Sequence, residues 1–287
     1  MDKSDPKNII KKHYRKLSKL IKIVNKHFET ESIHQLRVEY KKLRAFLRMI
    51  SEEKDGEQEI KIPGKLKKAY HIAGSIRDLQ LQCKSIPAIT EEETKKPESY
   101  LKLLKQYIQK LKPEFLNIPL KKTIEKSIKK TGELTVEKIN TIHSGKFINN
   151  NCTAIIAIII SRNFSDVNMH AIRKHLKDIF YTIQRLEDED EEIKFNIPEI
   201  SNMEKKYFDE LLEEFGNFQD KVTSLTLLED QWLNSLNIFN RQILVRAKKS
   251  LTIDKDKIKS GLINKLLYEI IPHLQLICNI DKQPTNR

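Results

Sequence analysis

Glycine and proline are scarce in this sequence. Its 287 residues contain 7 Gly and 9 Pro, so each makes up about 2–3% of the chain, below the average usage in globular proteins. β-Sandwiches and β-barrels need these residues at many turns. The composition therefore argues against a turn-rich β fold and favours long helices with few connections.

Cysteine and long apolar runs are also rare. The three cysteines, Cys83, Cys152 and Cys278, show no metal-site spacing, and an odd number cannot all pair internally, so we expect a reduced, intracellular compartment. The most apolar run, 154–160, is too short to cross a bilayer, and the N-terminus has charges but no apolar signal segment. We therefore expect a soluble, cytoplasmic protein.

Charged residues, in contrast, are abundant. Lys and Arg number 53 against 40 Asp and Glu, which gives a net charge of +13, with 39% hydrophobic and 32% charged residues. These proportions are those of a globular chain, and the length suits two domains or one domain with two halves. The excess of positive charge indicates an acidic partner without naming it.

Apolar residues recur at helical spacing through most of the chain, and no segment alternates as a strand would. We expect helices over residues 10–28, 33–51, 66–86, 100–112, 119–131, 136–160, 167–186, 200–221, 225–247 and 256–280. The sequence thus predicts an all-α fold in which helical bundles are the natural packing.

Two of these helices resemble each other when shifted by 136 residues. His34, Arg37 and Lys41 then coincide with His170, Arg173 and Lys177, and five apolar positions coincide as well. Any two amphipathic helices share an apolar stripe, but three matched polar positions make the match specific. The chain is therefore predicted to contain two related halves.

A second pair of similar segments follows downstream. Gly74 and Asp78 in the first half correspond to Gly216 and Asp220 in the second. Because glycine inside a helix costs about 1 kcal/mol relative to alanine, we assign the pair to packing, such as a close approach of helices. Each aspartate either accepts hydrogen bonds from neighbouring basic side chains or is simply solvated.

A stripe of basic residues runs along the helix over 33–51. Its members are spaced three or four residues apart: His34, Arg37, Lys41, Arg44 and Arg48. Each follows an apolar residue by one position, about 100° around the helix, so the stripe borders the core and would line a groove between helices. Such a line of cations suits a linear polyanion; the alternative is a solvated stripe paired with carboxylates of a neighbouring helix. The two histidines would contact phosphate or serve as hydrogen-bonded structural residues.

These motifs resemble those of the CHAD domain, the conserved histidine α-helical domain. The resemblance rests on the run from His34 to Arg44, on His170, Arg173, Lys177 and Tyr181, and on the two Gly-x-x-x-Asp elements. It implies one domain over residues 7–280, built as four-helix-bundle-like halves at 7–132 and 133–280 related by a pseudo-twofold axis. A polar tail over 281–287 would follow.

The resemblance also implies a function. CHAD domains are regarded as non-catalytic binders of inorganic polyphosphate, and some associate with polyphosphate granules. Carried over residue by residue, the binding positions are His34, Arg37, Lys41, Arg44, Arg48, His170, Arg173 and Lys177, with Lys42, Lys174, Arg77 and Tyr181 as secondary candidates. Phe180 and Gln184 stand where the first half has Arg44 and Arg48, so we expect tighter phosphate contact in the N-terminal half.

Three other functions are compatible with parts of the sequence. A nucleic-acid-binding protein would suit the charge, but no recognition motif supports it. An enzyme acting on polyphosphate would need a metal held by carboxylates, for which the sequence offers only Asp78 and Asp220 as a pair. A helical scaffold would need an apolar surface patch. The string 57–61 matches a triphosphate tunnel motif, but the sequence shows none of the strands of that fold. We therefore expect no catalytic residue, metal or cofactor.

Overall fold

The chain is described by a computed structural model over residues 5–52, 61–93, 95–131, 141–188 and 202–278. Throughout these residues the regular structure is α-helical, and they contain no β-strand. The predicted all-α class is therefore confirmed. None of the helices in the described ranges combines the length and apolar character needed to cross a membrane.

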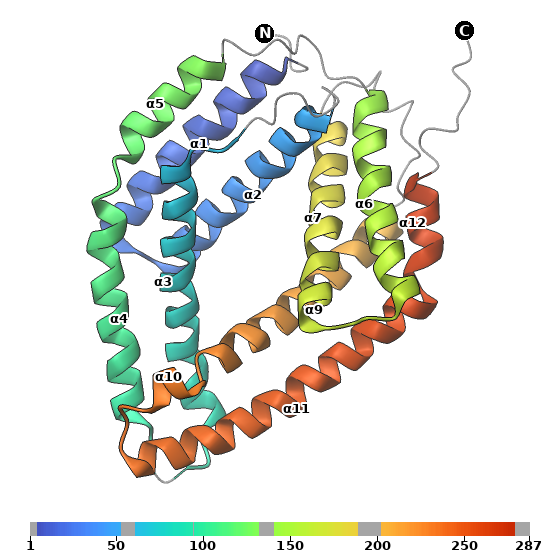
Figure 1. The fold of residues 1–287 in the computed structure, drawn as a ribbon. Coiled ribbons are helices and arrows are strands. Elements are labelled where there is room, and N and C mark those ends of the chain that lie inside the picture. The colour runs from blue at the N-terminus through green and yellow to red at the C-terminus, as the bar shows by residue number, and fades with distance from the viewer. Residues whose placement is uncertain (1–4, 53–60, 94, 132–140, 189–201, 279–287) are drawn as a thin grey trace, which may run out of the picture.

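The described helices fall into two groups along the chain (Figure 1). The first group comprises α1 (Pro6–His27), α2 (Thr30–Glu52), α3 (Gly64–Ile89), α4 (Glu98–Leu116) and α5 (Leu120–Thr131). The second comprises α6 (Thr141–Ser161), α7 (Asp166–Asp188), α9 (Asn202–Thr226), α10 (Asp230–Leu233), α11 (Ile238–Tyr268) and α12 (Ile270–Cys278).

Local sequence signals explain where α1 begins and ends. The Asp5 side chain accepts a hydrogen bond of 2.9 Å from the Lys7 backbone N–H, which caps the helix start. At the other end Phe28 adopts a left-handed conformation with φ of 53°. Its apolar residues recur at helical spacing and are buried: Ile10, Tyr14, Leu17, Ile21 and Val24.

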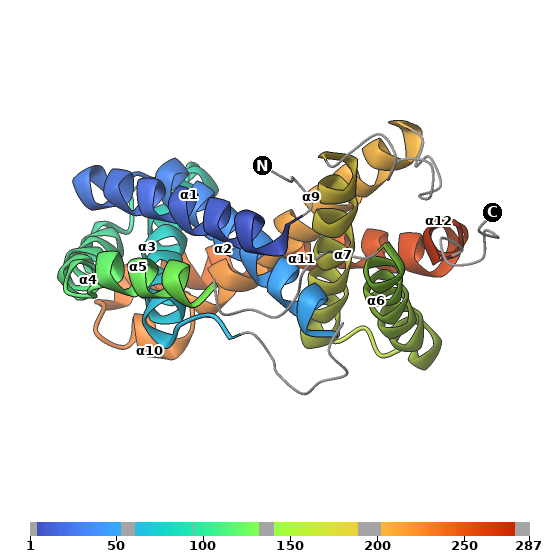
Figure 2. The ribbon, with the colours of Figure 1, turned by 90° about the horizontal axis from the view of Figure 1, so that it is seen from above.

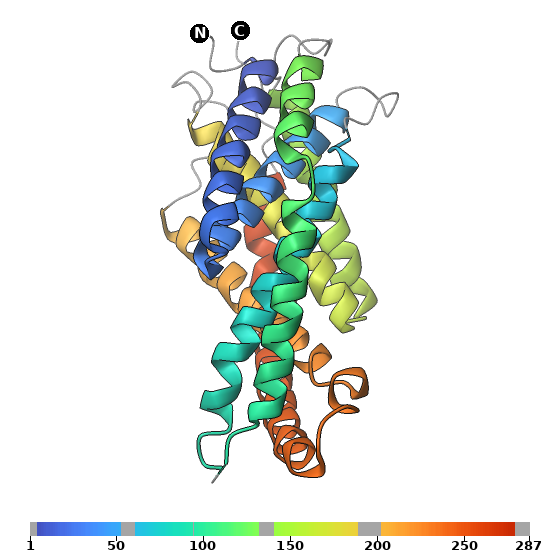
Figure 3. The same cartoon turned by 90° about the vertical axis from the view of Figure 1, so that its left-hand side faces the viewer.

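The helices enclose two separate hydrophobic cores. The first is built mainly by α1 to α5, with α1 and α5 side by side (Figure 3), and is completed by α10 and by Leu244 and Leu251 of α11. The second is built by α6, α7, α9 and α12 together with Leu262 and Leu266 of α11. The long helix α11 therefore contributes to both cores, and α9 runs beside it across the molecule (Figure 1).

A buried hydrogen-bond network joins α3 and α4 to α9. Gln82 Nε2 donates to the Tyr100 hydroxyl at 3.1 Å, and the Ser224 hydroxyl donates to Gln82 Oε1 at 2.5 Å. The Tyr100 hydroxyl in turn donates to the Leu227 carbonyl at 2.7 Å. Gln82 and Ser224 are counterparts when the Gly74 and Gly216 segments are aligned, so matched positions of the two halves meet here.

The helices predicted over 225–247 and 256–280 have different boundaries in the structure. The polar segment 248–255 contains neither glycine nor proline, and its Leu251 is buried, so α11 continues through it. The break lies earlier, before Asn237, whose side chain accepts a hydrogen bond of 2.9 Å from the Asn240 backbone N–H and caps α11. The polar composition of this segment predicted a loop, because few residues in this part of the helix face the core.

Two helices also continue past the prolines at which the sequence predicts that they end. Pro87 lies within the last turn of α3, and Pro113 within α4, which continues to Leu116. A proline removes one helical hydrogen bond, but Phe115 is completely buried two residues after Pro113. Its packing stabilises the turn that the proline would otherwise disrupt.

The division into halves at 132 and 133 stays a prediction, because residues 132–140 lie outside the described ranges. The tail at 281–287 and the acidic residues 189–192 also lie outside them. The first core nevertheless takes residues from both sides of that division, since α10 and the start of α11 complete it.

Candidate anion-binding site

The two helices that carry the repeated motif contact each other between the cores. α2 and α7 adjoin in both views of the molecule (Figures 1 and 2). The apolar stripe of α2 is buried in the first core and that of α7 in the second. Because each basic residue follows its stripe by one position, the cations of both helices gather where the helices meet.

Lys41 lies at the centre of this cluster. Burial, followed by the positive charges of Lys177, Arg37, Arg173 and Arg44, lowers the pKa of Lys41 to about 6. Lys177 is its counterpart on α7, and burial together with Arg173 lowers the pKa of Lys177 to about 8. Cations of both repeats therefore repel one another in a partly desolvated space.

Paired arginines lie against the paired glycines. A Cβ atom at Gly74 would overlap the Arg37 guanidinium, so a side chain there would displace Arg37. On the second helix pair, Arg173 Nη2 lies 3.8 Å from the position of a Cβ at Gly216. The close approach expected at both glycines is thus made by an arginine side chain, tightly at Gly74 and loosely at Gly216.

Aromatic rings support Arg37 from the other side. Its Cζ lies 4.8 Å from the centroid of the Tyr70 ring, which stacks on Tyr40 with a centroid distance of 4.2 Å. This cation–π contact fixes the guanidinium without neutralising it. Tyr70 was missed at the sequence level, because only the packing of α3 on α2 places it beside the stripe.

Asp78 and Asp220 lie among the cations, which favours the first of the two roles expected for them. Burial raises the pKa of Asp78, against the opposing effect of Arg37 and Arg77. The charge of Asp220 acts on Lys177 and Arg173 in the opposite sense to burial and favours their charged forms. Two carboxylates therefore face the larger group of cations.

Arg48 has a different environment from the rest of the stripe. Its Nη1 donates to Asp178 Oδ2 of α7 at 2.6 Å, and the Asp178 side chain is only 5% exposed. At this one position the stripe is paired with a carboxylate of a neighbouring helix, which is the alternative to ligand binding considered for the stripe. Asp178 was missed as a partner, although it follows Lys174 by one helical turn on the same helix.

Both motif histidines lie in surroundings that favour the neutral ring. Burial and the charge of Arg77 lower the pKa of His34. Burial also lowers the pKa of His170, although its Nδ1 lies 2.6 Å from Gln219 Oε1 in a hydrogen bond that acts in the opposite direction. With the site free of ligand, both imidazoles are therefore neutral at neutral pH.

Three guanidinium groups of the cluster have a buried Nε–H without a hydrogen-bond acceptor in the described part of the chain. They belong to Arg44, Arg77 and Arg173. A buried donor that lacks an acceptor costs about 1–3 kcal/mol and more when charged, and such groups are rare in folded proteins. The arrangement is that of a site whose acceptors come from a ligand.

The structure places all twelve candidate residues in one connected cluster. Each interacts electrostatically or through a ring contact with at least one other member. Phe180 and Gln184, which replace the arginines in the second half, instead line an apolar pocket with Phe208 of α9 and Ile277 of α12. The helix α7 therefore contributes fewer cations to the cluster than α2. Contact with a ligand stays a prediction for each member.

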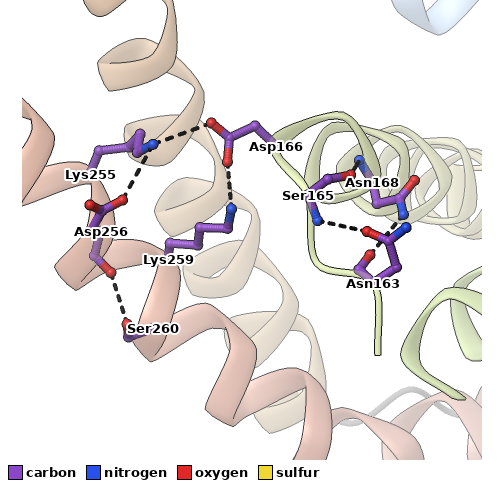
Figure 4. Close-up of polar contacts among 8 residues, drawn as sticks. All are labelled: Asn163, Ser165, Asp166, Asn168, Lys255, Asp256, Lys259 and Ser260. Carbon is purple, nitrogen blue, oxygen red and sulfur yellow. Dashed lines mark hydrogen bonds and ion pairs between the residues drawn. The ribbon is translucent and has the colours of Figure 1, made fainter. Parts of the chain in front are cut away.

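The start of α7 is held in place by ion pairs with α11 (Figure 4). Asp166 Oδ1 lies 2.6 Å from Lys259 Nζ, and Asp166 Oδ2 lies 3.4 Å from Lys255 Nζ. One residue earlier, the Ser165 hydroxyl accepts a hydrogen bond from the Asn168 backbone N–H and caps the helix. These contacts orient the turn from which His170 and Arg173 project.

No group of three or more His, Cys, Asp or Glu side chains in the described ranges is arranged to hold a metal ion. The side chain of Cys83 is partly buried and that of Cys152 is buried. The chemistry that the described cluster offers is accordingly that of many hydrogen-bond donors and few acceptors.

Comparison with known proteins identifies the fold. The family model of the CHAD domain matches residues 8–117. The crystal structure of the CHAD domain from the plant Ricinus communis superposes with a TM-score of 0.67 and 16% sequence identity, covering 91% of this chain and 93% of the other. A search of curated proteins finds no match. Residues 8–117 therefore belong to the CHAD domain family, and the chain as a whole has the fold of a CHAD domain.

Proposed function

We propose that this protein binds inorganic polyphosphate, without catalysing a reaction, along a basic groove formed where α2 and α7 meet. The observation that carries the proposal is the cluster of cations from both helices and α3, in which three buried guanidinium N–H groups find no acceptor among the described residues. Phosphate oxygens supply the acceptors that these groups need. The CHAD resemblance adds that the anion is polyphosphate.

In this proposal the residues along the site contribute unequally to binding. Arg37, Lys41 and Arg44 form its centre, since they are partly buried and lie beside the α7 cations. Arg48 contributes less, because it is already paired with Asp178. The α7 side contributes Arg173 and Lys177 and then ends at Phe180, which supports the expectation of tighter contact with α2.

The test compares two triple variants by titration with sodium polyphosphate of one defined length. R37A/K41A/R44A should weaken binding by about a hundredfold or more, because three charge-assisted contacts of about 1–1.5 kcal/mol each are lost. The matched control, K102A/K105A/K110A, removes the same charge from exposed positions of α4 and should change affinity far less.

Helical circular dichroism should be equal in both variants. Equal loss of affinity in the two triples would mean that net charge alone binds the polymer, which would contradict the site. Affinity should also fall steeply as salt increases, because binding releases counterions condensed on the polymer.

Nucleic acid is the alternative partner that the charge also permits. Aromatic residues do lie near the cluster, but Tyr40 and Tyr70 stack on each other instead of presenting free faces. Competition between polyphosphate, RNA and duplex DNA at moderate salt separates the two ligands. Retention of nucleic acid against excess polyphosphate would reverse the assignment, and release of phosphate in the presence of Mg²⁺ would contradict the absence of catalysis.

A further inference from the structure

A second basic surface lies on α1 and α5, outside the cluster at α2 and α7. Along α1 a row of exposed cations follows at intervals of three or four residues: Lys12, Arg15, Lys19, Lys22 and Lys26. At 1.5 Å per residue this row is about 21 Å long. It lies on the side of the helix opposite the buried residues, so its side chains point away from the first core.

The neighbouring helix α5 carries a second row with the same orientation. Lys122, Lys126 and Lys129 are exposed and lie opposite the buried Leu120 and Ile124. The helices α1 and α5 contact each other and run side by side on the first core (Figure 3). The two rows therefore form one surface that is two helices wide, and these eight residues are called the α1–α5 surface.

The positive charges of this surface are not offset by carboxylates. The helix α1 contains no Asp or Glu, and α5 contains only Glu125. None of the eight cations forms an ion pair with another residue in the described ranges, whereas Lys16 of α1, outside the row, pairs with Glu39 of α2. Like charges at this spacing repel one another, and a surface that serves solubility alone would mix both signs. An anionic partner accounts for the arrangement.

The shape of the surface distinguishes between anionic partners. The major groove of a nucleic-acid duplex accepts a single helix, and single strands are bound by aromatic rings on which the bases stack. Here two helices lie side by side, Tyr14 of α1 is buried and α5 has no aromatic residue. Anionic lipids, in contrast, move within the bilayer and gather beneath cations at any spacing. Groups of four to eight Lys or Arg on an amphipathic helix are typical of proteins that bind such lipids.

From these observations we propose that the α1–α5 surface docks the protein on an anionic phospholipid bilayer. Both helices are described in full, and Ile23, with 47% exposure, is their only exposed large apolar residue. The helices therefore lie on the headgroups without inserting deeply, and binding weakens as salt rises. This inference does not depend on polyphosphate binding, which is assigned to other helices.

The experiment is cosedimentation with vesicles of phosphatidylcholine that contain about one third phosphatidylserine, at about 0.1 M salt. K19A/K22A/K126A removes three charges from the surface and should weaken vesicle binding by about a hundredfold, since each lysine contributes roughly a factor of five. The matched control, K206A/K249A/K257A, removes the same charge from exposed positions of α9 and α11 and should change binding far less. Alanine favours helices, so both variants should keep their helical circular dichroism.

Binding that requires phosphatidylserine, falls as salt rises and is lost only in K19A/K22A/K126A supports the inference. Binding to pure phosphatidylcholine, equal loss in the two triple variants, or no cosedimentation of the unmodified protein overturns it. Retention of duplex DNA through the same three lysines, without vesicle binding, also overturns it and would assign the surface to nucleic acid.

A further variant separates this inference from the proposed function. R37A/K41A/R44A should bind vesicles as the unmodified protein does, and K19A/K22A/K126A should still bind polyphosphate. Loss of vesicle binding in R37A/K41A/R44A alone would mean that lipid phosphates occupy the cluster at α2 and α7, which contradicts a separate docking surface. Loss of polyphosphate binding in the unmodified protein would contradict the proposed function and leave this inference intact.

Discussion

At the scale of single residues, Gly74 controls the position of Arg37. A side chain at this place in α3 would occupy the space of the guanidinium, which lies between the helix backbone and the Tyr70 ring. The glycine therefore stabilises a binding geometry at the expense of helix propensity. Gly216 has the same place in the second repeat but leaves more room, since Arg173 lies 3.8 Å from its Cβ position.

This difference predicts opposite results for two identical substitutions. G74A should displace Arg37 and weaken polyphosphate binding by about tenfold, because one charge-assisted contact of about 1–1.5 kcal/mol is lost. G216A should retain affinity and raise the free energy of unfolding by up to about 1 kcal/mol through helix propensity. Titration and thermal unfolding of both variants measure the contrast, and equal effects on affinity would show that the Arg37 position is unimportant.

At the scale of helices, the contact between α2 and α7 combines attractive polar and aromatic contacts with repulsion between like charges. Arg48 pairs with Asp178, and the Arg185 guanidinium carbon lies 3.8 Å from the centroid of the Phe46 ring. The positive charge of Lys177, which directly precedes Asp178, acts on Lys41 of α2. The attractive contacts therefore hold the two helices together against this repulsion when no ligand is bound.

Breaking the Arg48–Asp178 pair should test this division. R48A leaves a carboxylate with 5% exposure unpaired and should lower the free energy of unfolding by about 2 kcal/mol, less than the 3–5 kcal/mol of a fully buried pair because Arg48 is 44% exposed. D178A should cost less, since the remaining arginine can be hydrated. Denaturant unfolding measures both, and a larger cost for D178A would contradict the argument.

The same variant distinguishes a structural arginine from a ligand contact. In R48A, polyphosphate affinity should fall less than in R37A, because Arg48 already has an internal acceptor. A larger loss of affinity in R48A would place the centre of the site at the other end of α2.

At the scale of the whole molecule, the cluster makes the ligand-free protein sensitive to pH. Folding lowers the pKa of Lys41 to about 6 and of Lys177 to about 8, from 10.5 as the ordinary value of lysine. Between these values and pH 10.5 the unfolded chain binds more protons than the folded one, so stability rises with pH. The lower stability at lower pH is the cost of holding these cations close together with no anion bound.

The prediction is that the ligand-free protein becomes more stable between pH 6.5 and 9, on the order of 1 kcal/mol per pH unit. Thermal unfolding over this range measures the trend, and K41M should flatten it. Saturating polyphosphate should flatten the trend, because amines that stay charged in the complex bind as many protons as they do in the unfolded chain. Stability that is flat or falls with rising pH in the unmodified protein would contradict the shifts at Lys41 and Lys177.

The amino-acid sequence by itself determined the helical class, the similarity of the two motif helices and the identity of the basic residues. These follow from local patterns: apolar spacing, matched polar positions and the one-residue offset between the stripe and the core. Helix ends were less well determined, because packing of Leu251 and Phe115 extends α11 and α4 past polar or proline-containing segments.

Only the tertiary structure decided how the basic residues differ from one another. It brought Lys41 to Lys177, placed Arg37 on Gly74 and Tyr70, and gave Arg48 a buried partner in Asp178. Periodicity assigns a residue to one side of its own helix, but the charges and rings opposite come from segments more than a hundred residues away. The shortage of glycine predicted long helices; the way those helices pack decided where one of the few glycines was needed.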